Sequence, residues 1–403
     1  MSSGTISVQA QPHLSARGIS RSGLIALVLL SLGHFCVDLY SSALAAFQPL
    51  LVTKLGLSLT QAGLLGGVMI CSSSVMQPAY GYLSDRFRSR LFSALAPAVA
   101  GVFISALGMA PSYGWLMAMV ALGGAGIASF HPQASSRVGM STTSQRGRWM
   151  AVFISSGTLG MATGPTYFTT LANRLGLERT FWGALPGIAV TILLLVFLAS
   201  DGSRVSSERH RFDWRPLRAV WKPLTVLYFA VFIRSIVQIS FTQFIPLYLT
   251  RERGYSLAAA SVTLSVYLVS GALGGFIGGY FADRFGGRLV ILISMIGSVP
   301  FLALFMLTSG ALSTIGLAMG GLVLLFTVPV NVVMAQELVP TQSGTISALM
   351  MGFAWGAAGV IFIPLTGWVA DLTSLHLALT ALVAFPVLGF FLTLKLPKDL
   401  RHA

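Results

Sequence analysis

A histidine and an aspartate lie four residues apart in the first long apolar stretch of the sequence, as His34 and Asp38. On a helix, this spacing places both side chains on one face. Asp38 is the only one of the eleven acidic residues that lies deep in an apolar stretch. A charge there is costly and typically faces a cavity where it is used, and imidazole titrates near neutral pH. The pair therefore predicts proton exchange, with a structural aspartate held by hydroxyls or by His34 as the alternative.

A single base, Arg234, lies equally deep in a later apolar stretch, with Gln238 one helical turn further on. Its planar guanidinium stays charged and matches the oxygens of phosphonate, phosphate or carboxylate groups. Two roles are open for Arg234: contact with an anionic substrate, or a structural counter-ion for Asp38. The roles need not exclude each other, because a substrate anion could compete with Asp38 for the guanidinium.

A third polar cluster contains His131, Pro132 and Gln133. Proline frees a backbone carbonyl one turn earlier, and such interrupted backbone is tolerated in an apolar segment where it lines protein or water. His131 is thus a candidate for proton exchange and for substrate contact, and Asn331 lies near the position equivalent to Gln133 in an internal repeat. The predicted proton-coupling residues are Asp38, His34 and His131, and the predicted substrate contacts are Arg234, Gln238, Gln133, Asn331 and His131.

The composition places these residues in a membrane protein. Hydrophobic residues make up 55% of the chain and charged residues 9%, whereas soluble proteins carry about 25% charged residues. The apolar runs are continuous and about twenty residues long, which is the length of a membrane-spanning helix and not the alternating pattern of a barrel strand. Basic residues that flank such helices explain the net charge of +14, so no nucleic acid partner is expected.

The sequence offers no residues for a disulfide, a metal site, nucleotide binding or catalysis. Cys36 and Cys71 both lie in apolar stretches, where a cysteine acts as a small hydrophobic residue, so neither a disulfide nor a metal site is expected. The sequence contains no Gly-Lys-Ser/Thr nucleotide-binding loop and no catalytic constellation. We therefore expect no enzyme activity and no cofactor, with a proton gradient as the energy source.

The apolar pattern predicts an all-α membrane protein of twelve spans. The predicted limits are 23–51, 60–83, 91–110, 114–137, 149–171, 181–200, 221–249, 257–281, 289–308, 312–335, 344–370 and 376–395. The predicted organisation is a disordered tail at 1–22, a first half at 23–200, a linker at 201–220, a second half at 221–396 and a tail at 397–403.

The distribution of basic residues predicts the orientation of these spans. With the N-terminus inside, 19 of the 25 lysines and arginines lie in the tails and inner loops, and 5 lie in the outer loops. Because short cytoplasmic loops carry an excess of Lys and Arg, both termini are expected in the cytoplasm.

The two halves of the chain repeat each other. The segment 81–91 (GYLSDRFRSRL) recurs at 279–289 (GYFADRFGGRL) with an offset of 198, and Pro132 recurs as Pro329 at 197. Parallel repeats of this kind, with the substrate bound between them near the bilayer midplane, are a known plan of secondary transporters.

The repeated segments resemble the loop signature of the major facilitator superfamily, Gly-x-Leu-Ala-Asp-Arg-x-Gly-Arg-Lys, which implies that family's fold of two six-helix halves. The first copy has Arg88 where the family usually has Gly. Charged residues at these helix ends could hold neighbouring helices in one conformation, and ordinary flanking charge is the alternative. The predicted gating residues are Asp85, Arg86, Asp283, Arg284, Arg137 and Glu337, the last on the resemblance alone.

Three further stretches, at 31–40, 130–137 and 335–340, are similar to the fosmidomycin resistance protein family, a branch of the same superfamily. That family's known member exports a phosphonate antibiotic by using the proton gradient, so the resemblance implies efflux by proton antiport. Gln133 departs from the family's usual His-Pro-Glu, which leaves Asp38 as the only deep carboxylate available for coupling.

A last stretch, Gly160-Met-Ala-Thr-Gly164-Pro165, resembles part of the antiporter signature of drug exporters, and close packing of small residues explains it equally well.

Together the patterns predict a secondary transporter that exports a small polar or anionic compound, such as a phosphonate antibiotic, by proton antiport with alternating access. Proton-coupled uptake of a small organic anion is the alternative. We expect a monomer in the bacterial inner membrane, with a small-molecule substrate, protons and the lipid bilayer as its partners.

Overall fold

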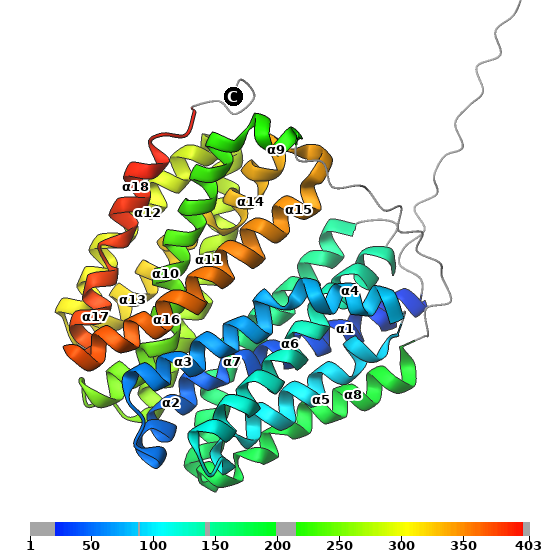
Figure 1. Cartoon of the computed structure of the whole chain (residues 1–403), viewed down its shortest axis with the longest axis vertical. Helices are drawn as coiled ribbons and strands as arrows, with labels where there is room; N and C mark the ends of the chain where they lie inside the picture. The colour runs from blue at the N-terminus through cyan, green and yellow to red at the C-terminus, as the bar shows by residue number, and fades with distance from the viewer. Residues whose placement is uncertain (1–20, 88, 142–145, 199–214, 398–403) are drawn as a thin grey trace, which may run out of the picture.

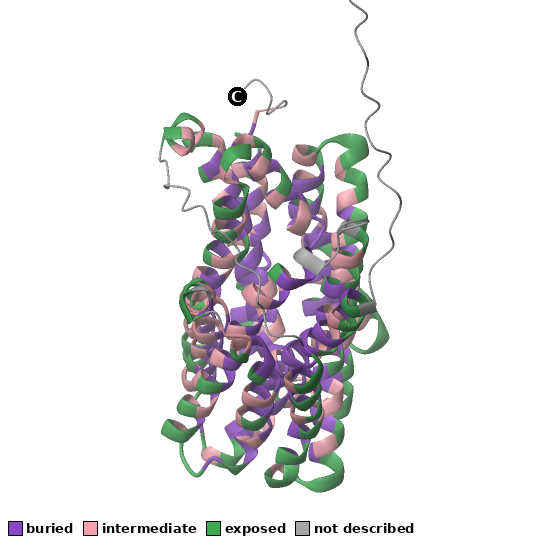
Figure 2. Cartoon of the chain, turned by 90° about the vertical axis from the view of Figure 1, so that its right-hand side faces the viewer, coloured by how far each residue is buried: buried purple, intermediate pink, exposed green. Residues whose placement is uncertain are grey.

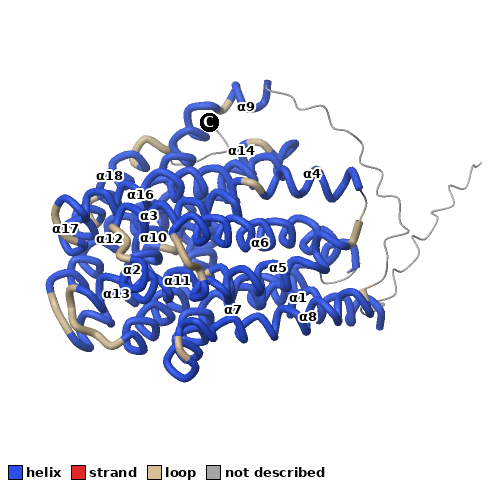
Figure 3. The backbone as a smooth tube through the Cα atoms, turned by 60° about the horizontal axis from the view of Figure 1, so that its bottom comes forward, coloured by secondary structure: helices blue, strands red, loops and turns tan. Residues whose placement is uncertain are grey.

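The computed structural model describes residues 21–87, 89–141, 146–198 and 215–397. These residues form helices joined by short turns, with no strand among them (Figure 3), which confirms the predicted all-α class. Spanning helices satisfy their backbone hydrogen bonds internally, as an apolar environment requires. The tails predicted at 1–22 and 397–403 lie almost wholly outside the described residues, as do position 88 and residues 201–214 of the predicted linker. The rest of that linker, 215–220, is described and contains the short helix α9 (Arg215–Ala219).

Helices α1 to α8 form the first half. In chain order they are α1 (Arg21–Ser41), α2 (Ala43–Leu55), α3 (Leu59–Ile70), α4 (Gln77–Phe87), α5 (Leu91–Ser105), α6 (Tyr113–Ser141), α7 (Arg146–Leu175) and α8 (Leu185–Phe197). A π-helical segment, η1 (Cys71–Val75), joins α3 to α4, and the 3-10 segments η2 (Ala106–Met109) and η3 (Leu177–Ala184) follow α5 and α7.

Helices α9 to α18 form the second half. They are α9 (Arg215–Ala219), α10 (Trp221–Arg251), α11 (Leu257–Phe285), α12 (Gly287–Leu307), α13 (Gly310–Leu324), α14 (Thr327–Leu338), α15 (Ser343–Ser347), α16 (Trp355–Leu372), α17 (Leu375–Leu382) and α18 (Phe385–Thr393). The 3-10 segment η4 (Pro340–Gln342) precedes α15, and a second π-helical segment, η5 (Ala348–Ala354), joins α15 to α16.

Eleven helical stretches of the described chain are long and apolar enough to cross a membrane. The predicted spans correspond to these stretches, several of which are built from two shorter helices, with the exception of α7. Helix α7 has 30 residues but is rich in glycine, serine and threonine, which lowers its hydropathy. It packs against α1 in its own half and against α11 in the other, so its polar and small residues face protein on those sides.

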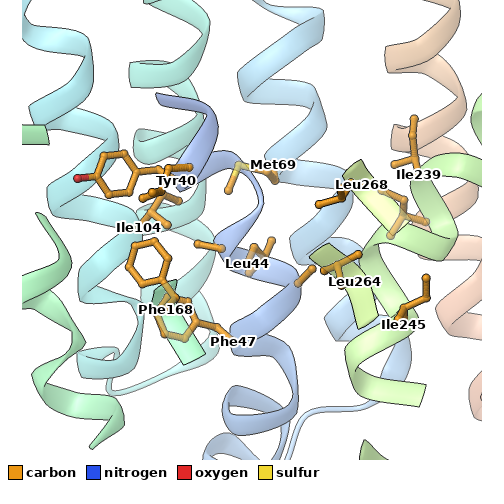
Figure 4. Packing of buried hydrophobic residues seen from close by; sticks show 14 of the residues in the cluster. Tyr40, Leu44, Phe47, Met69, Ile104, Phe168, Ile239, Ile245, Leu264 and Leu268 are labelled. Carbon is orange, nitrogen blue, oxygen red and sulfur yellow. The ribbon is translucent and has the colours of Figure 1, made fainter. Parts of the chain in front are cut away.

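The two halves are in contact at one end of the molecule and diverge toward the other (Figure 1). We call the end where α1 begins and α18 ends the terminal face, and the end where α3 begins and α16 ends the opposite face. One buried apolar cluster crosses between the halves near the opposite face, and Figure 4 shows Leu44 and Met69 of the first half near Leu264 and Leu268 of the second. A separate cluster toward the terminal face contains residues of the second half alone.

Buried residues run through the centre of the molecule and exposed residues cover its outside (Figure 2). Large hydrophobic side chains are among the exposed ones, including Leu307, Val196 and Phe276. An apolar outer surface suits a protein whose surroundings are lipid, because there water is not the solvent that the side chains meet.

The carboxylate of Asp371 connects the two halves at the opposite face. Asp371 at the end of α16 accepts hydrogen bonds from the backbone N–H groups of Leu59 and Thr60, both at 2.8 Å, and from the Thr60 hydroxyl at 2.5 Å. These donors belong to the first turn of α3, whose N-terminal amides have no partners within the helix. Asp371 therefore joins the second half of the molecule to the first.

The contacts made by the signature segments recur in both halves. Arg86 donates to the Tyr82 hydroxyl at 3.4 Å, and Arg284 donates to the Tyr280 hydroxyl at 3.5 Å. Arg90 bonds to the Leu198 carbonyl, and Arg288 bonds to the Leu394 carbonyl. The sequence repeat is thus also a repeat of local structure.

Candidate functional site

Helices α1 and α6 bring three titratable side chains together inside the first half. His34 and Asp38 occupy successive turns of α1, with His34 Nε2 3.3 Å from Asp38 Oδ2. His131 of α6 reaches the other carboxylate oxygen, with Nε2 3.2 Å from Asp38 Oδ1. The imidazole rings of His34 and His131 meet edge to face, with their centroids 5.1 Å apart. We call these three residues the triad.

Backbone carbonyls fix the orientation of both histidines. His34 Nδ1 lies 2.7 Å from the Phe153 carbonyl oxygen of α7, and His131 Nδ1 lies 2.9 Å from the Ile127 carbonyl oxygen of α6. A carbonyl oxygen can only accept, so each Nδ1 carries a hydrogen. Each Nε2 then faces an oxygen of Asp38. If no proton lies between the two atoms, the lone pair of the nitrogen and those of the carboxylate oxygen repel each other. Both contacts are satisfied only when each holds a proton, so the triad has room for two exchangeable protons.

Helix α7 covers the triad at close range. The Phe153 ring stacks on the His34 ring, with centroids 4.3 Å apart. A Cβ atom placed on Gly157 would lie 2.4 Å from His34 Nε2 and 2.5 Å from Asp38 Oδ2. Gly160 and Gly164 pack on the backbone of α1 in the same way. A Cβ atom added to Gly160 would lie 2.0 Å from the Phe35 carbonyl oxygen, and one added to Gly164 would lie 2.3 Å from that of Leu39. The glycines of the stretch at 160–165 are therefore helix-packing residues in this structure.

Replacing Gly157 with alanine is expected to force α7 away from α1 and to disturb the triad, because the added methyl group would overlap His34 and Asp38. Overpacking of this kind costs about 1–3 kcal/mol. The melting temperature of the detergent-purified protein measures the effect. Gly114→Ala, also in a helix, is the matched control, since an added Cβ there meets nothing within 4 Å. Equal melting temperatures for the two variants would contradict the predicted overlap.

The spacing of the triad would also admit one metal ion, because one ligand atom from each residue lies within 4.8 Å of the others. Each carboxylate oxygen, however, faces a different histidine at hydrogen-bond distance. We therefore treat both contacts as proton-sharing hydrogen bonds.

Arg234 lies in the other half, on α10, with 5% of its surface exposed. Its Nη1 donates to the side-chain oxygen of Gln238, one turn further along the helix. Among the described residues, the ion pairs of Asp38 are with the two histidines and not with Arg234. In this structure the groups in contact with the Asp38 carboxylate are therefore His34 and His131, and not Arg234.

Other polar groups of the second half are buried without hydrogen-bond partners among the described residues. They include Nε of Arg234, the Tyr267 hydroxyl and both polar atoms of the Asn331 amide. Tyr267 and Asn331 are both fully buried. Leaving such groups unpaired costs about 1–3 kcal/mol each, so they are suited to receiving a polar ligand or water.

Gln133 is placed differently from the substrate contact that the sequence predicts. Its Nε2 donates to the Ser84 hydroxyl and to the Ser89 carbonyl, both at 2.8 Å, and its Oε1 accepts from the Ser93 N–H at 2.9 Å. Both amide hydrogens are used, so the side chain has no donor left for a substrate. Gln133 joins α6 to the end of α4 and the start of α5.

The predicted gating residues are scattered around the terminal face. Arg86, Asp283, Arg284 and Glu337 are exposed, and Arg137 is buried on α6. The side chain of Asp85 lies outside the described residues. Arg86 and Arg284 bond to tyrosines of their own helices, and α4 packs on α6 and η1 of its own half.

Sequence reasoning missed three residues that shape the site: Phe153, Gly157 and Tyr267. Gly157, Gly160 and Gly164 follow one another at helical spacing, so the packing face of α7 was detectable in the sequence. The Phe153 carbonyl and the Tyr267 hydroxyl have no comparable sequence signal, because their roles depend on which helix lies beside them.

Comparisons with known proteins identify the family of the chain. The Major Facilitator Superfamily model matches residues 30–363 and 227–402. The chain is 28% identical to the fosmidomycin resistance protein of Escherichia coli (strain K12), over 98% of this chain and 99% of that protein. It is 31% identical to an uncharacterized MFS-type transporter of Bacillus subtilis (strain 168), over 93% of each.

The fold has solved counterparts as well. A bacterial homologue of the human lysosomal transporter Spinster, in an inward-facing and occupied conformation, superposes with a TM-score of 0.78 at 14% identity, over 91% of this chain and 95% of that one. The match to the family model confirms the resemblance of the repeated loop signature, and relatives such as the one from Bacillus subtilis are named as transporters. The chain therefore belongs to the major facilitator superfamily, as a multi-pass membrane transporter.

Proposed function

We propose that this transporter exports a small anionic compound, of the phosphonate type, in exchange for protons. The observation that carries the proposal is the division of charge between the halves. The first half holds a carboxylate between two histidines, and the second holds a buried guanidinium that has no acidic partner among the described residues. A proton site on one side and an anion site on the other are what such an exchange requires.

Similarity to the fosmidomycin resistance protein supports the direction and the substrate class. Fosmidomycin is a phosphonate, and a guanidinium binds phosphonate oxygens through paired hydrogen bonds. Gln238, Asn331 and Tyr267 supply further polar groups near the same helices. Gln133 is not part of this proposed site, because its amide hydrogens are already bonded.

The contacts between the halves support a mechanism of alternating access. α3 and η1 pack along α16 and η5, whereas α4 and α15 beyond them diverge (Figure 1). With the basic residues inside, the terminal face is the cytoplasmic one in a bacterial inner membrane. In this state the substrate would enter from the cytoplasm to Arg234 while the triad releases its protons to the same side. After the halves rock, protons would reload the triad from outside as the substrate leaves.

Transport assays in inverted membrane vesicles test the proposal. With an interior acidified by respiration, radiolabelled fosmidomycin should accumulate inside vesicles that contain the protein, and collapsing the pH gradient should release it. Vesicles without the protein are the control. Accumulation only in right-side-out vesicles under an inward proton gradient would show uptake instead, and would overturn export.

A further inference from the structure

Three consecutive residues of α6 touch two different parts of the first half. His131 belongs to the triad, with Nε2 3.2 Å from Asp38. Pro132 faces Gly81, the first residue of the loop signature, where an added Cβ would lie 3.6 Å from Pro132 Cβ. Gln133 bonds the residues that follow in this segment. A single turn of helix thus spans the distance from the proposed proton site to the loop signature.

Gln133 holds that loop through every polar atom of its amide. Its three partners lie on the end of α4, on the turn and on the start of α5: Ser84, Ser89 and Ser93. These partners are uncharged hydroxyl and backbone groups, and Arg86 and Arg90 are the bases that neighbour them in the sequence. A shift of α6 at Gln133 would therefore be passed to both helices that the loop connects.

The second half lacks the polar part of this arrangement. Pro329 repeats the contact of Pro132, lying 3.8 Å from a Cβ placed on Gly279. The residues on either side of it are Val328 and Val330, where the first half has His131 and Gln133. The proline–glycine contact is thus common architecture, whereas the link between a titratable group and the loop is a specific feature of the first half.

We propose that Gln133 is a positioning residue that transmits protonation of the triad to the terminal ends of α4 and α5. The inference rests on the proposed proton coupling. It adds the route by which a change in the protonation of the triad moves the helix ends at the terminal face. When protons leave, the contacts of His131 with Asp38 become repulsive and α6 shifts relative to α1. Because Pro132 packs on Gly81 and Gln133 bonds to Ser84, Ser89 and Ser93, the end of the first half shifts with it.

A spin-label distance across the terminal face tests this route. Phe87 and its repeat mate Phe285 are exposed at 63% and 57%, so Phe87→Cys and Phe285→Cys can carry the labels in a Cys36→Ala, Cys71→Ala background. In this full-length protein in nanodiscs, we expect the distance distribution to shift between pH 6 and pH 8. Asp38→Asn should remove the shift.

Gln133→Leu should reduce the pH-dependent change in the spin-label distance distribution, measured as the ratio of its short-distance to its long-distance population. We expect a reduction of at least about fivefold, which is the effect of one lost net hydrogen bond. Gln133→Glu keeps an acceptor for Ser93 and should give an intermediate change, which serves if the leucine variant is unstable. Ser129→Ala is the matched control. It removes a different hydrogen bond between α6 and α5, from Ser129 Oγ to the Phe92 carbonyl at 3.1 Å, and should leave the shift intact.

The outcomes separate the route from the proton site. If Asp38→Asn removes the shift and both Gln133 variants retain it in full, the route through Gln133 is wrong and the proton site stands. If Ser129→Ala abolishes the shift as well, general packing of α6 explains the effect and the inference also fails. If Asp38→Asn retains the shift, the triad is not the proton site, and the inference falls with the proposed function.

Discussion

Replacing Asp38 with asparagine is expected to abolish fosmidomycin accumulation driven by a pH gradient. Asparagine has nearly the same size, so the packing of α1 against α6 and α7 should persist. It cannot share protons with His34 and His131, however, because the amide does not ionise near neutral pH. Gradient-driven uptake into inverted vesicles should fall to the level of vesicles without the protein.

Exchange of substrate at equal pH should survive in the same variant, because that exchange needs substrate binding and the rocking of the halves but no net proton movement. Ser41→Ala is the matched control, since it removes only a local hydrogen bond from Ser41 Oγ to the Asp38 carbonyl, 2.8 Å long, on the same helix. Gradient-driven accumulation at the wild-type level by Asp38→Asn would rule out the triad as the coupling site.

Replacing Arg234 with alanine should weaken the binding of anionic phosphonates by about 10- to 100-fold, which corresponds to the 1.5–3 kcal/mol of a hydrogen bond to a charged group. Arg234→Lys should recover part of the loss, because lysine restores the charge but not the planar pair of donors. Titration calorimetry of fosmidomycin binding to the purified protein measures the effect.

Arg251→Ala provides the control for Arg234, because Arg251 is an exposed arginine at the end of the same helix. Its loss should leave affinity unchanged. An uncharged hydroxamate that lacks the phosphonate should bind the wild type and Arg234→Ala with equal affinity. If Arg234→Ala instead binds fosmidomycin as tightly as the wild type, the anion contact lies elsewhere and the proposed substrate site is wrong.

The fold could be predicted from the sequence because long apolar runs leave the chain few alternatives. A run of about twenty apolar residues must be a helix in lipid, and the repeat at an offset of 198 relates the two halves. The interruptions inside spans were not predictable in the same way. The π-helical turns of η1 and η5 conform to neighbouring helices, and apolar periodicity carries no information about them.

For the site as well, contacts within one helix could be predicted from the sequence, whereas contacts between helices could not. His34 and Asp38 lie together because four residues make one helical turn, which any reading of the sequence shows. His131 joins them from 93 residues away, and only the packing of α6 on α1 decides this. Gln133 looked like a substrate contact because it closely follows His131, yet two residues of helix rotate the side chain by about 200°, toward the α4–α5 loop.

Asp371 connects the two halves at the opposite face by a contact of limited strength. A carboxylate at an exposed helix N-terminus stabilises the contact by about 0.3–1 kcal/mol, which biases a two-state equilibrium by no more than about fivefold. Water can replace all three donors as soon as the helices separate. The contact of Asp371 thus adds a weak bias toward the state in which the halves meet at the opposite face, and it does not trap the protein in that state.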